Sequence, residues 1–317
     1  MSIKRPPAIV YYVIKTALVV LGIMVFCGIG SPLAAQSVEP SREAQTESRP
    51  RVALVLGGGG AKGYAHIAVL ELLEELKIPI DMVIGSSAGT LIGGLYCAGY
   101  STETIKSLLF DVDWVPLYQD QPASPFEREL GELPLRFRID NGFDLDWDKG
   151  LATGERAYAQ FKQLTAHIPS YIDFDRLRIP FRATAVELPA NRLVLLDRGD
   201  LAEAIRASFG MPGLFQPFPI DGKRYMDGGV RNNLAIREVR EMGFDIIIAV
   251  DLFPDIDTFD SAPLSVPEQM LRLNWYSQSE AQYPLADAVL APPVGDYSIA
   301  SFLQAEEIYT RAAADTE

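Results

Sequence analysis

The residues with the clearest potential for chemistry are Gly85-Ser86-Ser87-Ala88-Gly89, a G-x-S-x-G pattern. An apolar stretch precedes the pattern and a stretch rich in small residues follows it. This is the strand-turn-helix setting of a nucleophilic serine. The glycines leave room for a sharp turn that holds the Ser87 hydroxyl clear of the backbone. The positive end of the helix dipole would favour an alkoxide-like Ser87. The plain alternative is that Ser87 only caps the helix.

A second candidate site is the glycine run 57–60, followed by Ala61, Lys62 and Gly63. It also lies between an apolar stretch and an expected helix, so its backbone N–H groups would form a site for negative charge. A triphosphate-binding loop requires Ser or Thr after the lysine, and Gly63 stands there instead.

Two functions of the glycine run remain open on spacing alone. The glycines fit G-x-G-x-x-G, and Asp81 lies about 20 residues further on, as in a dinucleotide site. The other function is an oxyanion hole, which we favour because the serine pattern follows on the next expected strand. Both loops would then open at the same edge of the sheet.

The histidines do not suit a Ser-His-Asp triad. There are two, His66 and His167. His66 precedes Ser87 and falls inside an expected helix, while about half of the domain follows His167, although the triad histidine of an α/β-hydrolase lies in a late loop. Asp227, followed by two glycines, is the other possible proton acceptor, because a carboxylate hydrogen-bonded directly to the serine can take its proton in the transition state. An ordinary Asp-Gly turn is the alternative.

These three motifs, in this order, resemble those of the patatin-like phospholipase family, whose members use a Ser-Asp dyad without histidine. The likeness extends from about residue 51 to the C-terminus, through stretches such as GGGGAKGYAHIAVLELLEE and IRASFGMPGLFQPFPIDGKRYMDGGVRNNL. One departure is Ala235, where relatives often have proline. It concerns the start of a helix rather than the chemistry.

The resemblance implies a role for each motif residue. Ser87 would be the nucleophile and Asp227 its proton acceptor. The oxyanion hole would consist of the backbone N–H groups of Gly58, Gly59, Gly60 and Ala88. The residues that would support these motifs are Lys62, Gly63, Gly85, Gly89, Gly228 and Gly229. The implied substrate is a glycerophospholipid, taken from a lipid or membrane surface, and no metal, nucleotide or organic cofactor is implied. A general carboxylesterase or lysophospholipase is the alternative, followed by an inactive lipid-binding protein.

The elements that must position these residues alternate between short apolar runs and amphipathic stretches. This order predicts a mostly parallel sheet covered on both faces, a three-layer α/β/α fold. We expect strands at 52–56, 80–84, 181–186, 193–196, 224–226, 245–250 and 288–290. We expect helices at 63–76, 88–98, 154–165, 201–209, 235–242, 267–282 and 303–314. The segment 111–149, which holds Trp114 and Trp147, has weak periodicity, and we expect either a cap over the site or a plain surface excursion.

Charge and the N-terminal segment bear on partners and location. The formal net charge is −14 without a basic cluster, so nucleic acid is an unsuitable partner and any membrane contact would depend on apolar side chains. Residues 1–35 have a basic start, an apolar run and small residues at the end, as in a signal peptide, with an uncleaved anchor as the alternative. We expect a flexible linker at 36–50, a catalytic domain at 51–317, and an exported protein, periplasmic or secreted.

Overall fold

The computed structural model describes residues 49–118, 137–139, 143–145, 152–254 and 266–315. The expected signal peptide, most of the expected linker and most of the segment 111–149 lie outside these residues. None of the helices in the described ranges is long and apolar enough to cross a bilayer.

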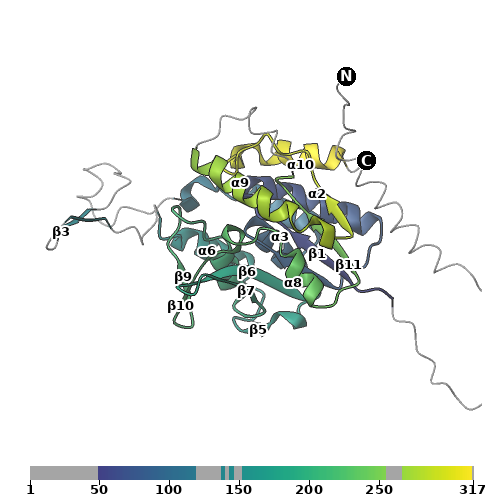
Figure 1. The fold of residues 1–317 in the computed structure, drawn as a ribbon, viewed down its shortest axis with the longest axis horizontal. Helices are drawn as coiled ribbons and strands as arrows, with labels where there is room; N and C mark the ends of the chain where they lie inside the picture. The colour runs from purple at the N-terminus through teal and green to yellow at the C-terminus, as the bar shows by residue number, and fades with distance from the viewer. Residues whose placement is uncertain (1–48, 119–136, 140–142, 146–151, 255–265, 316–317) are drawn as a thin grey trace, which may run out of the picture.

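An eight-stranded mixed sheet forms the centre of the domain (Figure 1). Its strands are β1 (Val52–Leu56), β2 (Met82–Gly85), β6 (Phe181–Leu188), β7 (Arg192–Leu196), β9 (Phe218–Ile220), β10 (Lys223–Asp227), β11 (Ile246–Val250) and β12 (Ala288–Leu290). The order is β12-β11-β1-β2-β6-β10-β9, with β7 also paired to β6. The strands from β12 to β6 run parallel, whereas β7, β10 and β9 add antiparallel pairs. Two small antiparallel sheets pair β3 (Phe137–Ile139) with β4 (Phe143–Leu145), and β5 (Ile172–Asp173) with β8 (Arg198–Gly199).

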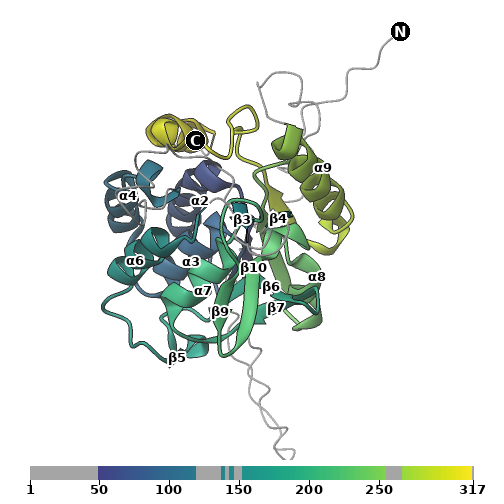
Figure 2. The same cartoon turned by 90° about the vertical axis from the view of Figure 1, so that its left-hand side faces the viewer.

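Helices cover both faces of the sheet. They are α2 (Tyr64–Glu75), α3 (Ala88–Cys97), α4 (Thr102–Phe110), α6 (Glu155–Leu164), α7 (Leu201–Ser208), α8 (Ile236–Glu241), α9 (Val266–Glu280) and α10 (Ala305–Ala314). Figure 2 shows α2, α3, α4, α6 and α7 on one side of the sheet and α8 on the other. The sequence prediction of a three-layer α/β/α fold with a mostly parallel sheet is confirmed.

The alternation of side chains along β1 explains the two apolar layers. Leu54 and Leu56 belong to the larger core cluster, which contains side chains of α2 and α3. Ala53 and Val55 point to the opposite face and pack in the cluster that contains α8. All of β1 is buried, as expected for a central strand of a parallel sheet.

The structure adds one helix to those expected and gives the position of one tryptophan. Helix α4 is not among the expected helices, although Ser101 caps it by accepting a hydrogen bond from the Thr104 N–H at 3.1 Å. Trp114, near the start of the segment expected to form a cap, is only 5% exposed, and its Nε1–H donates to the Tyr64 hydroxyl at 2.7 Å. Trp147 lies outside the described residues.

Candidate functional site

Ser87 occupies a strained turn between β2 and α3. Its φ of 50° and ψ of −117° are outside the regions that non-glycine residues favour, as in a nucleophile elbow. The flanking glycines cannot be replaced without movement of the backbone. A Cβ at Gly85 would lie 2.5 Å from the Gly89 carbonyl oxygen, and one at Gly89 would lie 2.2 Å from the Leu56 carbonyl oxygen. The turn therefore depends on both glycines of the pattern.

Strand β6 brings Asp227 to Ser87. Gly85, the last residue of β2, pairs with Ala183 of β6, and Asp227, the last residue of β10, pairs with Ala185. Strand β7 occupies the opposite edge of β6 at both positions, so β2 and β10 share one edge and run toward each other. Two residues of a strand span roughly 7 Å. The turns that follow β2 and β10 therefore meet.

The Asp227 carboxyl is buried, with 2% of the residue exposed, and lies close enough to the Ser87 side chain for hydrogen bonding with it to act on the pKa of the carboxyl. Its Oδ1 also accepts the N–H of Gly229 at 2.8 Å. Burial raises the pKa of Asp227 from 3.8 to about 6, although both hydrogen bonds act to lower it. A Cβ at Gly228 would lie 2.2 Å from Thr184 Oγ1, so this turn also requires glycine. The carboxyl is thus held beside the serine with a pKa suited to proton acceptance near neutral pH.

The glycine loop lies against the serine turn, but its first expected donor is occupied. The Gly58 N–H donates to Asn233 Oδ1 at 3.0 Å, and Asn233 Nδ2 donates to the Gly58 carbonyl at 3.2 Å. Within the described ranges, the N–H groups of Gly59, Gly60 and Ala88 donate to no backbone or side-chain acceptor. These three can therefore face a bound anion. The Ala88 N–H also lies in the first turn of α3, where the helix dipole adds to the positive potential.

Gly60 and Gly63 are sterically required. Gly60 has a φ of +56°, and a Cβ there would lie 2.3 Å from the carbonyl oxygen of Ile299. A Cβ at Gly63 would lie 2.6 Å from the Cβ of Ala88. The glycine loop thus packs between the start of α3 and a late segment of the chain.

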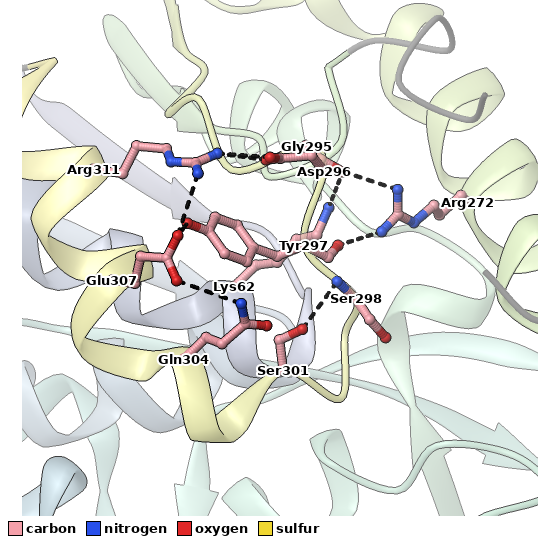
Figure 3. Close-up of polar contacts among 10 residues, drawn as sticks. All are labelled: Lys62, Arg272, Gly295, Asp296, Tyr297, Ser298, Ser301, Gln304, Glu307 and Arg311. Carbon is pink, nitrogen blue, oxygen red and sulfur yellow. Dashed lines mark hydrogen bonds and ion pairs between the residues drawn. The ribbon is translucent and has the colours of Figure 1, made fainter. Parts of the chain in front are cut away.

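Lys62 connects the glycine loop to that late segment (Figure 3). The lysine is fully buried, its Nζ donates to the Gly295 carbonyl at 2.9 Å, and it lies 4.2 Å from the centre of the Phe253 ring. Arg272 of α9 donates to the same carbonyl, also at 2.9 Å. Burial, followed by repulsion from Arg272, lowers the pKa of Lys62 to about 7. The Lys62 side chain therefore fixes the glycine loop to the segment that contains Gly295.

The same late segment makes a backbone contact with the glycine loop. The Ala61 N–H donates to the Ile299 carbonyl at 2.8 Å. On the other side, Glu268 of α9 accepts the Ile299 N–H at 3.1 Å and forms an ion pair with Arg272 at 3.2 Å. We call residues 295–301 the brace segment. It links α9 to the glycine loop.

Sequence reasoning missed Asn233 and Ser208. Asn233 joins the glycine loop to the turn after Asp227, and Ser208 Oγ accepts the N–H of Ser87 at 2.9 Å. Ser208 Oγ is also within 2.7 Å of Thr90 Oγ1. Both residues occur in the stretch quoted for the family resemblance, but no spacing within that stretch indicates their partners.

The two histidines have other roles. His66 is buried in α2, and its Nε2 donates to the Gly57 carbonyl at 2.7 Å, since a carbonyl can only accept. Burial lowers the pKa of His66 to about 4, so the ring is neutral at pH 7. His167 is exposed and contacts Tyr100 beyond the C-terminus of α3, whereas Ser87 precedes its N-terminus. Ten helical residues span roughly 15 Å, which separates His167 from the serine.

The structure does not support a dinucleotide site, because Asp81 is far from the glycine loop. Asp81 precedes β2, so it lies at the N-terminal ends of the parallel strands, whereas the glycine loop lies at their C-terminal ends. There it accepts the Val52 N–H at 2.8 Å and binds Arg49 at 2.6 Å. Among the described residues, no group of three or more His, Cys, Asp or Glu side chains could hold a metal ion.

Comparisons with known proteins identify the family that the chain resembles. The family model described as patatin-like phospholipase matches residues 54–240. An uncharacterized NTE family protein of Mycobacterium tuberculosis is 31% identical over 205 residues, which cover 65% of this chain and 50% of the relative. A protein named lysophospholipase nte1, of Emericella nidulans, is 30% identical over 63% of this chain and 12% of the relative. The chain therefore spans about half the length of its mycobacterial relative, and much less of the fungal one.

Among solved structures, the ExoU-SpcU complex of the Pseudomonas aeruginosa type III secretion system matches with a TM-score of 0.41 and 19% identity. That match covers 84% of this chain and 50% of the other chain.

Proposed function

Since this chain belongs to the patatin-like phospholipase family, we propose that it is a serine hydrolase that cleaves carboxylic esters of phospholipids and lysophospholipids. One observation carries the proposal: Ser87, in a strained turn at the head of a helix, lies beside the buried carboxyl of Asp227, which β6 brings to it. The name of the fungal relative, a lysophospholipase, supports a lipid ester as the substrate.

In the first half of the reaction, Ser87 Oγ attacks the ester carbonyl carbon while its proton passes to Asp227. The tetrahedral intermediate then collapses, the bond to the alcohol oxygen breaks, and the protonated Asp227 returns the proton to the departing alkoxide. The acyl group remains on Ser87. In the second half, Asp227 takes a proton from water, which attacks the acyl carbonyl carbon. The bond between this carbon and Ser87 Oγ then breaks, Asp227 returns the proton to Oγ, and the fatty acid leaves.

The negative charge that develops on the carbonyl oxygen requires donors placed in advance. The N–H groups of Gly59, Gly60 and Ala88 are the available ones, and Asn233 fixes the loop by holding both backbone groups of Gly58. Asn233 is thus a positioning residue, and Gly58 serves to anchor the loop rather than to donate to the oxyanion.

A fluorophosphonate probe tests the nucleophile. We expect labelling of wild-type protein at Ser87 and loss of both labelling and ester hydrolysis in Ser87→Ala. Ser86→Ala is the matched control, because Ser86 lies in the same turn and is also buried, at 1% exposed; it should keep both. A folded wild-type protein that is neither labelled nor active would instead favour a lipid-binding protein without catalysis.

We also propose export of the protein, on the basis of residues 1–35, which lie outside the described residues. N-terminal sequencing of the mature protein should give a start at or near Gln36. An intact N-terminus in a membrane fraction would favour an uncleaved anchor.

A further inference from the structure

A narrow apolar cavity begins beside the serine turn. Gly60 and Ala88 form the end nearest to Ser87, and Leu91 and Ile92 of α3 contribute to its wall. Its free volume is about 10 Å³, which corresponds to about one water molecule. The cavity therefore starts where an acyl carbonyl would bind but is almost filled.

Three aromatic rings, those of Trp114, Phe209 and Phe302, also line the cavity. Trp114 stacks on Phe302, with ring centres 5.0 Å apart and planes inclined by 20°. Its other neighbour is Phe209, at 6.1 Å and 27°. Phe209 follows Ser208, which holds the Ser87 amide, so this wall is continuous with the serine turn.

The two halves of the stack are anchored differently. Trp114 is held by its hydrogen bond to Tyr64, and the Tyr64 hydroxyl in turn donates to the Leu109 carbonyl at 2.7 Å. Phe302 lies against the rings of Trp114 and Tyr118 at the margin of the apolar core, and it begins the short 3-10 helix η8 (Phe302–Gln304). Its neighbour Leu303 is 92% exposed. We therefore expect that less free energy is needed to displace Phe302 than to displace Trp114.

We propose that this cavity is the acyl-chain site and that the Trp114–Phe302 stack is its end wall, which sets the chain length that the enzyme accepts. The inference rests on the function proposed above. A short acyl group fits in front of the stack, whereas a long one must displace Phe302. Each additional methylene that is buried favours binding roughly fourfold. A variant in which the stack is open should therefore show a higher kcat/KM for long-chain esters.

The test is the kcat/KM of p-nitrophenyl esters from acetyl to dodecanoyl. In wild type, the values should stop rising at a short chain. Phe302→Ala should raise the decanoyl-to-acetyl ratio at least tenfold, since two further buried methylenes already exceed that factor. Trp114→Phe keeps a ring but loses the bond to Tyr64, so a smaller shift in the same direction is expected. Leu303→Ala is the matched control and should leave the ratio unchanged.

The proposal is wrong if Phe302→Ala changes kcat/KM by the same factor at every chain length and the milder Phe302→Leu does the same. Binding of the product provides a readout that does not require catalysis. Dibromostearate should quench the fluorescence of Trp114 in the Ser87→Ala, Phe302→Ala double variant, in which the stack is open, with Trp114→Phe identifying the signal. Quenching in a protein that hydrolyses no ester would reject the proposed function and retain the acyl site. An active protein without quenching or chain-length shift would reject the acyl site alone.

Discussion

Asp227 combines two properties that oppose each other. Burial raises its pKa to about 6, which makes it a stronger base than an ordinary aspartate, yet at neutral pH it must carry a buried negative charge. Catalysis and stability should therefore respond to this side chain in opposite directions.

The first prediction concerns catalysis. Asp227→Asn keeps the shape of the side chain but cannot accept a proton, so hydrolysis of a soluble ester should fall roughly 10²–10⁴-fold. In wild type, kcat/KM should increase with pH and level off above about 6, because only the deprotonated carboxylate acts as the base. His167→Ala is the control and should stay within about tenfold of wild type. A loss in folded His167→Ala, with Asp227→Asn nearly intact, would replace the dyad by a triad.

The second prediction concerns stability. A pKa raised from 3.8 to about 6 means that the folded state binds the proton more tightly than the unfolded state. The resulting stabilisation is fully present below pH 3.8 and lost as pH rises through 6. At pH 8, where Asp227 is ionised in both states, the buried charge lowers the free energy of unfolding by about 3 kcal/mol relative to acid pH. Asp227→Asn should therefore melt several degrees above wild type at pH 8, and the difference should shrink at pH 4. Equal differences at the two pH values would contradict this assignment.

At the scale of elements, the turns that follow β1, β2 and β10 form one unit because side chains join them. Asn233→Asp would keep the acceptor for the Gly58 N–H but lose the donor to its carbonyl and add a negative charge near the developing oxyanion. We expect kcat on a soluble ester to fall roughly 10–100-fold with little change in KM. Asn191→Asp, on the exposed turn between β6 and β7, is the matched control. Equal kinetics of the two variants would show that the contact with Gly58 has no role in positioning.

Local sequence patterns were sufficient for most of the elements. The continuous apolar run of β1 and the small residues of α3 predicted both elements to within a residue. Helix α4 was missed although Ser101 and the apolar residues Ile105 and Leu109 follow the usual pattern. The position of Asp227 beside Ser87 depends on strand β6, and the pairing of β2 and β10 along one of its edges has no signal in their own sequences.

The contacts that sequence could not predict are those between distant residues. Asn233 and Gly58 are 175 positions apart, and Lys62 reaches Gly295 over 233 positions. Trp114 looked like a surface aromatic because its neighbourhood lacks periodicity, whereas its burial depends on Phe302 and Tyr64. Spacing along the chain carries no information on such partners.

At the scale of the whole molecule, charge should decide which lipid surfaces the protein can approach. With a formal net charge of −14, it should hydrolyse neutral phosphatidylcholine vesicles faster than vesicles that contain about one third anionic lipid. Added salt should narrow that difference, since the screening length shortens from about 10 Å at 0.1 M to about 3 Å at 1 M. A soluble neutral ester, measured in the same buffers, is the control. Faster hydrolysis of anionic vesicles, reduced by salt, would indicate a basic docking surface.

The brace segment has a consequence for the timing of activity. A ribosome adds residues in order, and Ser87 and Asp227 are both made before Ile299, whose carbonyl accepts the Ala61 N–H and packs against Gly60. A growing chain thus contains the nucleophile and its base while the glycine loop still lacks its support. We expect the proposed oxyanion donors to come into place only after the brace segment has left the ribosome and folded back onto the loop. Nascent chains that end before residue 295 should therefore hydrolyse a soluble ester much more slowly than the full chain.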